Sequence, residues 1–174
     1  MRVSMNHTGF VVKDLERSRR FYVEGLGLEE LAVFEFQSDD LAQIVGYENA
    51  KIYAAMLAGT DGHLLEIIQY LIPETAEADP EHQYPRAQTG ASHLAFYVED
   101  ARAMWTRLCD MGGVPMNPPV EVLPGVLECY MQDPDGNWIE ITQDNEHNRS
   151  QFKIRQIMSS AASSPHYVDR SRTA

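Results

Sequence analysis

The stretch HTGFVVKD at residues 7–14 decides the fold, because it returns as HLAFYVED at residues 93–100. Each copy begins at a His, continues as an apolar strand-like run and ends at an Asp that can cap a following helix. A second echo lies downstream, where GHLLEI at residues 62–67 returns as GNWIEI at residues 136–141. The chain therefore holds two copies of one supersecondary unit, each with a His and a Glu at matching places.

Both copies predict the same order of elements. The first reads as a strand over 3–12, a helix over 15–24, and strands over 31–36, over 51–57 and around Glu66. The second reads as a strand from His93, a helix after Asp100, strands over 120–123 and 126–131, a turn at 133–136 and a strand over 138–142. Each copy is thus a βαβββ unit, and the fold class is α+β.

Changes in composition divide the chain into four segments. The first unit covers residues 1–72, a Pro-containing linker covers 73–90, and the second unit covers 91–144. Residues 145–174 form a polar tail rich in Ser and Arg, with a short helix-like patch at 152–158. We expect the tail to be loose or to pack across a neighbouring subunit.

The charge balance excludes some classes of partner. The 14 Lys and Arg residues against 26 Asp and Glu give a net charge of −12, without a basic stripe for phosphates, so nucleic acid is not expected. No run approaches the roughly 18 apolar residues of a membrane span. Cys109 and Cys129 lie in apolar patterns. Reduced core thiols in a cytoplasmic protein fit this better than disulfides.

The repeated His and Glu residues predict a metal site. Side chains two apart share a strand face, so Glu66 and Glu140 both lie among apolar neighbours. An ionised carboxylate is costly to bury there unless it is paired or bound to a metal. Because His7 and His93 recur in register with these carboxylates, we expect all four residues to converge on one divalent ion.

Other polar residues leave alternatives open. Glu128 and Tyr130 share a face of their strand and either support the site or lie on the outer face. His63 is expected on the face opposite Glu66, and the polar stretch 37–50 is expected at the pocket rim. Asp133, Asp135 and Asn137 are interpreted as a turn, since the Gly and Glu of a calcium loop are missing.

The chain resembles the vicinal oxygen chelate superfamily, which includes glyoxalase I, epimerases, extradiol dioxygenases and fosfomycin resistance proteins. The matching pieces are residues 7–27 with DLERSRRFY and GLGL, the LLEI strand, residues 93–100, and DPDGNWIE at 133–140. The resemblance implies that the two units pair into a cupped eight-stranded mixed sheet around a divalent ion, within one chain or across a homodimer. It implies His7, Glu66, His93 and Glu140 as the ligands of Ni, Co, Zn, Mn or Fe.

The four implied metal ligands indicate which branch of the superfamily the chain resembles. Dioxygenases and fosfomycin enzymes use two His and one Glu, whereas this chain has Glu66 where they have His. Two carboxylates therefore favour the glyoxalase I and epimerase branch. Bacterial glyoxalase I carries an Arg four residues after its first His, and this chain has Val11 there; epimerases usually have Gln at the Glu66 position.

These features predict a metal-dependent isomerase, epimerase or lyase acting on a small oxygenated carbonyl substrate. The ion would polarise the carbonyl and hold the resulting enediolate, while Glu140 or Glu66 moves the proton. An iron-dependent ring-cleaving dioxygenase and a metal-free drug- or metabolite-binding protein remain as alternatives. We also expect a homodimer, since the sheets leave open edges.

Overall fold

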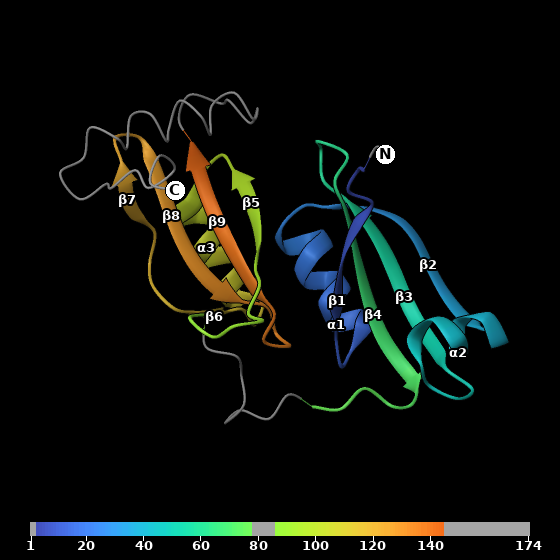
Figure 1. The fold of residues 1–174 in the computed structure, drawn as a ribbon. Coiled ribbons are helices and arrows are strands. Elements are labelled where there is room, and N and C mark those ends of the chain that lie inside the picture. Colours follow the sequence, from blue (N-terminus) through green and yellow to red (C-terminus); the bar gives the residue numbers. More distant parts are fainter. Residues whose placement is uncertain (1–2, 78–85, 145–174) are drawn as a thin grey trace, which may run out of the picture.

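The computed structural model describes residues 3–77 and 86–144, which fold as two similar units (Figure 1). The first unit consists of β1 (His7–Val11), α1 (Leu15–Arg19), the π-helix η1 (Arg20–Gly25), β2 (Glu29–Gln37), α2 (Asp39–Val45), β3 (Lys51–Ala58) and β4 (Leu64–Ile72). The second unit consists of β5 (Leu94–Val98), α3 (Ala101–Asp110), β6 (Val114–Pro115), β7 (Val120–Leu123), β8 (Val126–Gln132) and β9 (Trp138–Asp144). The α+β class and the repeated strand–helix–strands order are confirmed.

Each unit builds its own mixed sheet. The first has the order β1-β4-β3-β2, and the second has the order β5-β9-β8-β6 with β7 also paired to β8. In both sheets the first and last strands of the unit are parallel neighbours, β1 with β4 and β5 with β9. The described residues thus hold nine strands rather than the eight expected, because the segment before β8 pairs with it twice, as β6 and as β7.

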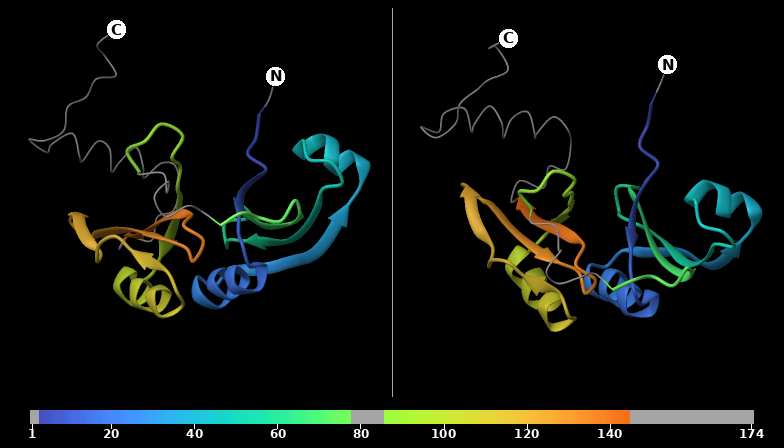
Figure 2. Two further views of the ribbon diagram at one scale, coloured as in Figure 1. Left: turned by 90° about the horizontal axis from the view of Figure 1, so that it is seen from below. Right: turned by 60° about the horizontal axis from the view of Figure 1, so that its bottom comes forward.

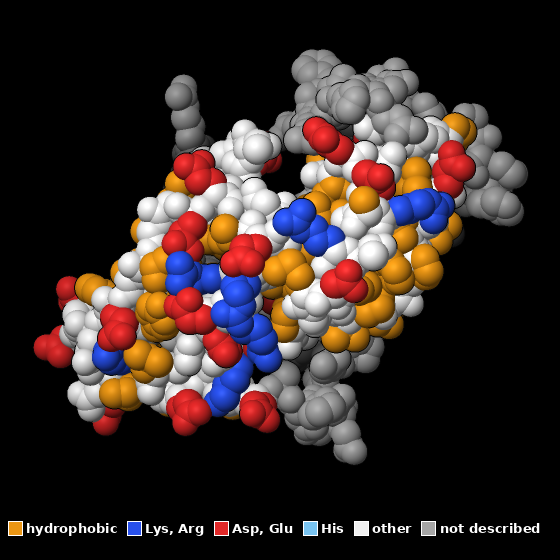
Figure 3. All heavy atoms as spheres, turned by 180° about the vertical axis from the view of Figure 1, so that it is seen from behind, with side chains coloured by type: hydrophobic (Ala, Val, Ile, Leu, Met, Phe, Trp, Pro, Cys, Tyr) orange, Lys and Arg blue, Asp and Glu red, His pale blue; other side chains and the backbone are white. Residues whose placement is uncertain are grey.

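The helices α1 and α3 lie side by side beneath the two sheets (Figure 2). One cluster of buried apolar side chains joins both units between these layers; its fully buried members include Leu15, Phe21, Leu57, Ile67, Leu108, Met131, Ile139 and Ile141. The helix-bearing side carries interspersed basic and acidic side chains (Figure 3), including the Arg19–Glu16 and Arg19–Glu30 ion pairs.

Helices α1 and α3 begin as the sequence predicts. Asp14 accepts a hydrogen bond from the Arg17 backbone N–H, and Asp100 accepts from those of Arg102 and Ala103. These caps satisfy backbone donors that a helix start leaves unpaired. The first helix differs from expectation after Arg19, where it continues to Gly25 as a π-helix.

A third helix, α2, lies in the polar stretch 37–50 that the sequence reading left without a helix. The Ser38 hydroxyl accepts from the Leu41 N–H, and Gly46 ends the helix with φ at 76°. Both are ordinary helix boundary signals. The helix packs Leu41, Ala42 and Val45 on the sheet face that carries Ile68 and Tyr70.

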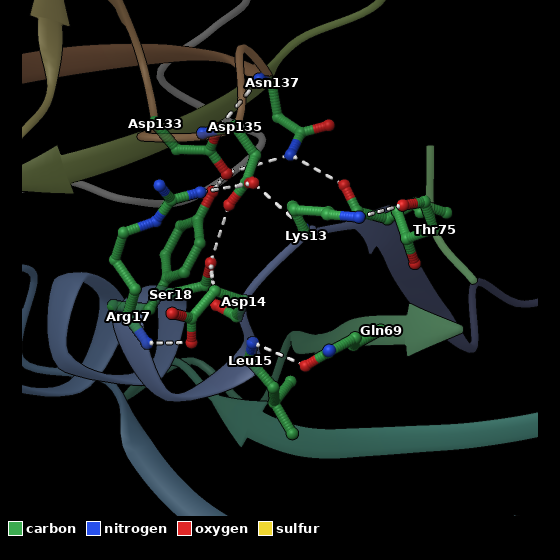
Figure 4. Close-up of polar contacts among 12 residues, drawn as sticks. Lys13, Asp14, Leu15, Arg17, Ser18, Gln69, Thr75, Asp133, Asp135 and Asn137 are labelled. Carbon is green, nitrogen blue, oxygen red and sulfur yellow. Dashed lines mark hydrogen bonds and ion pairs between the residues drawn. The ribbon is translucent and has the colours of Figure 1, made fainter. Parts of the chain in front are cut away.

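The turn between β8 and β9 fastens the second unit to the first (Figure 4). Asp133 is fully buried and accepts hydrogen bonds from the Tyr22 hydroxyl, at 2.8 Å, and from both nitrogens of Asn137. Burial raises the pKa of Tyr22 well above its ordinary value, so the hydroxyl stays protonated and donates. Asp133 also accepts from the Asp135 N–H, which confirms the turn interpretation of this motif.

Asp135 makes the contacts that cross between the units. Its carboxylate accepts from the Lys13 N–H at 2.9 Å, from Arg17 Nη2 at 2.6 Å and from Ser18 Oγ at 2.8 Å. The side chain is only 6% exposed. We call Asp133, Asp135 and these partners the inter-unit clasp.

Some expectations fall outside the described residues. The tail 145–174, its helix-like patch and linker residues 78–85 belong to them. Among the helices that are described, none is long and apolar enough to cross a membrane.

Candidate metal centre

The first His–Glu pair lies across two adjacent strands. His7 opens β1, Glu66 lies in β4, and the parallel register places Gly9 opposite Glu66. His7 Nε2 is 3.2 Å from Glu66 Oε2, and the two side chains are 38% and 17% exposed. The other ring nitrogen of His7, Nδ1, donates to Asn6 Oδ1 at 2.7 Å, which directs Nε2 towards the carboxylate.

The second pair has the same geometry. His93 directly precedes β5, Glu140 lies in β9, and the register places Ala95 opposite Glu140. His93 Nε2 is 3.1 Å from Glu140 Oε2, with exposures of 45% and 14%. The equivalence of the two pairs follows from the repeat, because both units join their first and last strands in parallel.

The structure places both glutamates on the sheet faces opposite helices α1 and α3. On β4, Leu65 and Ile67 are buried in the core, so the alternating Glu66 and Ile68 point to the opposite face. On β9, Ile139 and Ile141 alternate with Glu140 in the same way. Both glutamates therefore lie on the strand faces that the sequence predicts.

The two pairs do not meet within one chain. Across residues 3–77 and 86–144, no group of three or more His, Cys, Asp or Glu side chains is arranged to hold a metal ion. Each unit contributes half of the predicted ligand set, and the halves remain separate in the single chain.

Glu128 and Tyr130 lie on the sheet face that carries Glu140 rather than on the outer one. Tyr130 is directly opposite Glu140 in the β8–β9 register, and Glu128 is opposite Thr142. The Tyr130 hydroxyl is 3.4 Å from His93 Nε2, and the two rings meet edge to face. Burial, together with the nearby Glu140 charge, raises the pKa of Glu128.

Arg86 is a residue of this face that the sequence reading missed. Its guanidinium carbon lies 4.2 Å from the centre of the Tyr130 ring and 5.3 Å from that of Trp138. Arg86 belongs to the linker, so no strand or helix periodicity could have related it to the site.

His63 takes a different role from the other two histidines. Its Nε2 is 3.0 Å from the hydroxyl of Thr8, whose side chain points away from the His7 face of β1. His63 also borders a cavity of about 660 Å³ between the units, which Leu28, Leu65, Phe96, Met104 and Arg107 help to line. None of the four predicted ligands lines this cavity, so it is separate from the candidate centre.

Two βαβββ units, each with a His–Glu pair between its parallel strands, define the class of protein. The chain belongs to the Glyoxalase/Bleomycin resistance protein/Dioxygenase superfamily, whose family model matches residues 4–141. The resemblance inferred from the sequence is confirmed.

Two relatives and a solved structure are similar to this chain over most of its length. The chain is 29% identical over 140 residues to the uncharacterized protein YwbC of Bacillus subtilis, covering 80% of this chain and 96% of that protein. It is 29% identical over 143 residues to a "Probable lactoylglutathione lyase" of Synechocystis, covering 79% and 92%. A glyoxalase family protein from Bacillus cereus has the same fold, with a TM-score of 0.74, 24% identity and coverage of 82% and 95%.

Proposed function

We propose that the protein is a divalent-metal-dependent isomerase, epimerase or lyase for a small oxygenated carbonyl substrate. One Ni, Co, Zn, Mn or Fe ion per site would be held by His7, Glu66, His93 and Glu140. The observation that carries the proposal is the duplicated pair, with nitrogen–oxygen distances of 3.2 and 3.1 Å at equivalent places in both units.

The geometry of each pair fits a metal ion. Ligand atoms at about 2.1 Å from an ion and at right angles to each other are about 3 Å apart, which is the spacing of both pairs. The hydrogen bond from His7 Nδ1 to Asn6 corresponds to the tautomer with a lone pair at Nε2. The imidazole and carboxylate donors suit the proposed borderline metals.

A second copy of the chain would complete the centre. Catalytic ions usually take three or more protein ligands, whereas each unit offers two and the pairs are separate within the described chain. In a two-fold dimer, the first pair of one subunit can face the second pair of its partner, and symmetry then creates two equal sites. We therefore propose a homodimer in which each site is shared.

The proposed metal ligands would also carry out the remaining steps of the reaction. The bound ion would polarise a substrate carbonyl and make the adjacent C–H bond acidic. Glu140 or Glu66 would then remove the proton and return it, because each carboxylate already lies at the ion. The name of the Synechocystis relative favours a lyase within this group, whereas Val11 gives no cation for glutathione.

Metal content and hydrogen exchange test the proposal together. We expect about one divalent ion per subunit, a sedimenting dimer, and metal-dependent exchange of a substrate C–H with solvent deuterium across a panel of 2-hydroxy ketones and thioesters. His93→Ala should lose most of the metal, while His63→Gln should keep it. Glu140→Gln should keep most metal, since an amide oxygen can ligate, and lose exchange by roughly a hundredfold.

Other outcomes would contradict it. A monomer at micromolar concentration would refute the shared site. Full exchange in both Glu140→Gln and Glu66→Gln would refute the proton transfer. Oxygen consumption by the ferrous protein with a catechol would replace the proposal with a dioxygenase, and a chain that takes up no metal would replace it with a binding protein.

A further inference from the structure

Arg86 brings a positive charge to a face that is otherwise acidic. The face carries Glu128 and Glu140, and the whole chain has a net charge of −12. The described strand residues that share the His7–Glu66 and His93–Glu140 faces include no Lys or Arg. Apart from the proposed ion, Arg86 is therefore the cation of this face that could attract an anionic group of a substrate.

Aromatic rings hold Arg86 in place rather than a carboxylate. Its guanidinium lies over Tyr130 and near Trp138, and within the described chain no Asp or Glu forms an ion pair with it. Cation–π contacts use the face of a guanidinium and leave its edge N–H donors for a ligand. Arg86 is exposed, so these donors are open to solvent.

Tyr130 connects this cation to the proposed metal centre. Its ring lies beneath the Arg86 guanidinium and also meets the His93 ring edge to face, with centroids 5.2 Å apart. A ligand that reached the metal at His93 could therefore place a second group against Arg86 without leaving the face. Arginine binds the two oxygens of a carboxylate or phosphate in a forked arrangement.

We propose that Arg86 is an oxyanion-binding residue and that the substrate carries a carboxylate or phosphate in addition to its carbonyl group. The part of this inference that concerns the substrate rests on the function proposed above. The binding of an anion by Arg86 can be measured without metal. Arg86 would determine specificity and take no part in proton transfer.

The first test uses the metal-free protein with Trp105→Phe, so that Trp138 is the remaining tryptophan. Inorganic phosphate and succinate are titrated separately at constant ionic strength while Trp138 emission is followed. We expect a saturable change with at least one of them, and which one responds distinguishes a phosphate from a carboxylate. Arg86→Gln should weaken this binding at least tenfold, Arg86→Lys should weaken it less, and Arg102→Gln on α3 should leave it unchanged.

The second test compares matched substrates in the metal-loaded protein. Dihydroxyacetone phosphate and dihydroxyacetone differ only in the anionic group, and Arg86→Gln should reduce the preference for the phosphate in kcat/KM at least tenfold. Equal anion affinity in Arg86→Gln and the parent would overturn the proposal, as would a loss confined to thermal stability. If the protein exchanges no substrate hydrogen but Arg86→Gln still weakens anion binding, only the proposed reaction is refuted.

Discussion

Replacing Asp135 with Ala tests how firmly the inter-unit clasp holds the two units together. The carboxylate is 6% exposed and receives three hydrogen bonds, from the Lys13 N–H, Arg17 and Ser18. All three donors belong to the first unit, whereas Asp135 belongs to the second. The substitution therefore removes contacts between units and leaves the sheets themselves intact.

The expected loss follows from the individual contacts. The two hydrogen bonds from neutral donors to the carboxylate contribute about 1.5 kcal/mol each. The Arg17 ion pair would contribute more if buried, but the Arg17 side chain is 41% exposed, so we reduce its share to about 1 kcal/mol. Asp135→Ala should thus lower the free energy of unfolding by about 4 kcal/mol, which corresponds to a Tm decrease of about 8 to 16 °C for a chain of this size.

Two further variants separate charge from hydrogen bonding. Asp135→Asn keeps an acceptor oxygen for Lys13 and loses mainly the ionic part, so we expect a loss of about 1 kcal/mol. Glu48→Ala removes an exposed carboxylate from a turn and should change stability by less than about 0.5 kcal/mol. Urea unfolding followed by circular dichroism measures all three, and an Asp135→Ala protein as stable as the Glu48→Ala control would refute the reasoning.

Two more predictions concern the core. Burial raises the pKa of the Cys129 thiol to about 11, so little thiolate exists at pH 8. Iodoacetamide should therefore modify Cys129 far more slowly in the folded protein than in the unfolded chain. Equal rates of modification measured by mass spectrometry would contradict this. Gly113→Ala would bring a Cβ within 2.9 Å of the Leu108 carbonyl oxygen, so it should lower the free energy of unfolding in urea by about 1 to 3 kcal/mol. Gly9→Ala should be tolerated, because the nearest atom to its Cβ would be 4.0 Å away. Equal stability of the two variants would contradict the packing argument.

The duplicated segments made much of the fold predictable. Because strand and helix periodicities are local, the two His-initiated strands, the Asp caps and the Glu-centred strands could be read along the chain. Helix α2 was missed although Ser38 and Gly46 mark its two ends. It is only 7 residues long, too short to be stable by local propensity, so it depends on its packing against the sheet.

Other features depend on contacts between distant parts of the chain. Asp133 and Asp135 have the sequence of an ordinary turn, and only the packing of that turn against α1 shows that they join the units. Arg86 follows no periodic pattern, and its place over Tyr130 depends on the path of the linker.

The sequence by itself determined the strand face on which each glutamate lies, Glu66 with Leu64 and Ile68 and Glu140 with Trp138 and Thr142, since alternation along a strand requires only local geometry. The tertiary structure decided the partners: the parallel pairing of β1 with β4 and of β5 with β9 brings each His within about 3 Å of its own Glu. It also decided that the two pairs stay apart in one chain, because the orientation of the units depends on the shared core and the clasp rather than on any local signal.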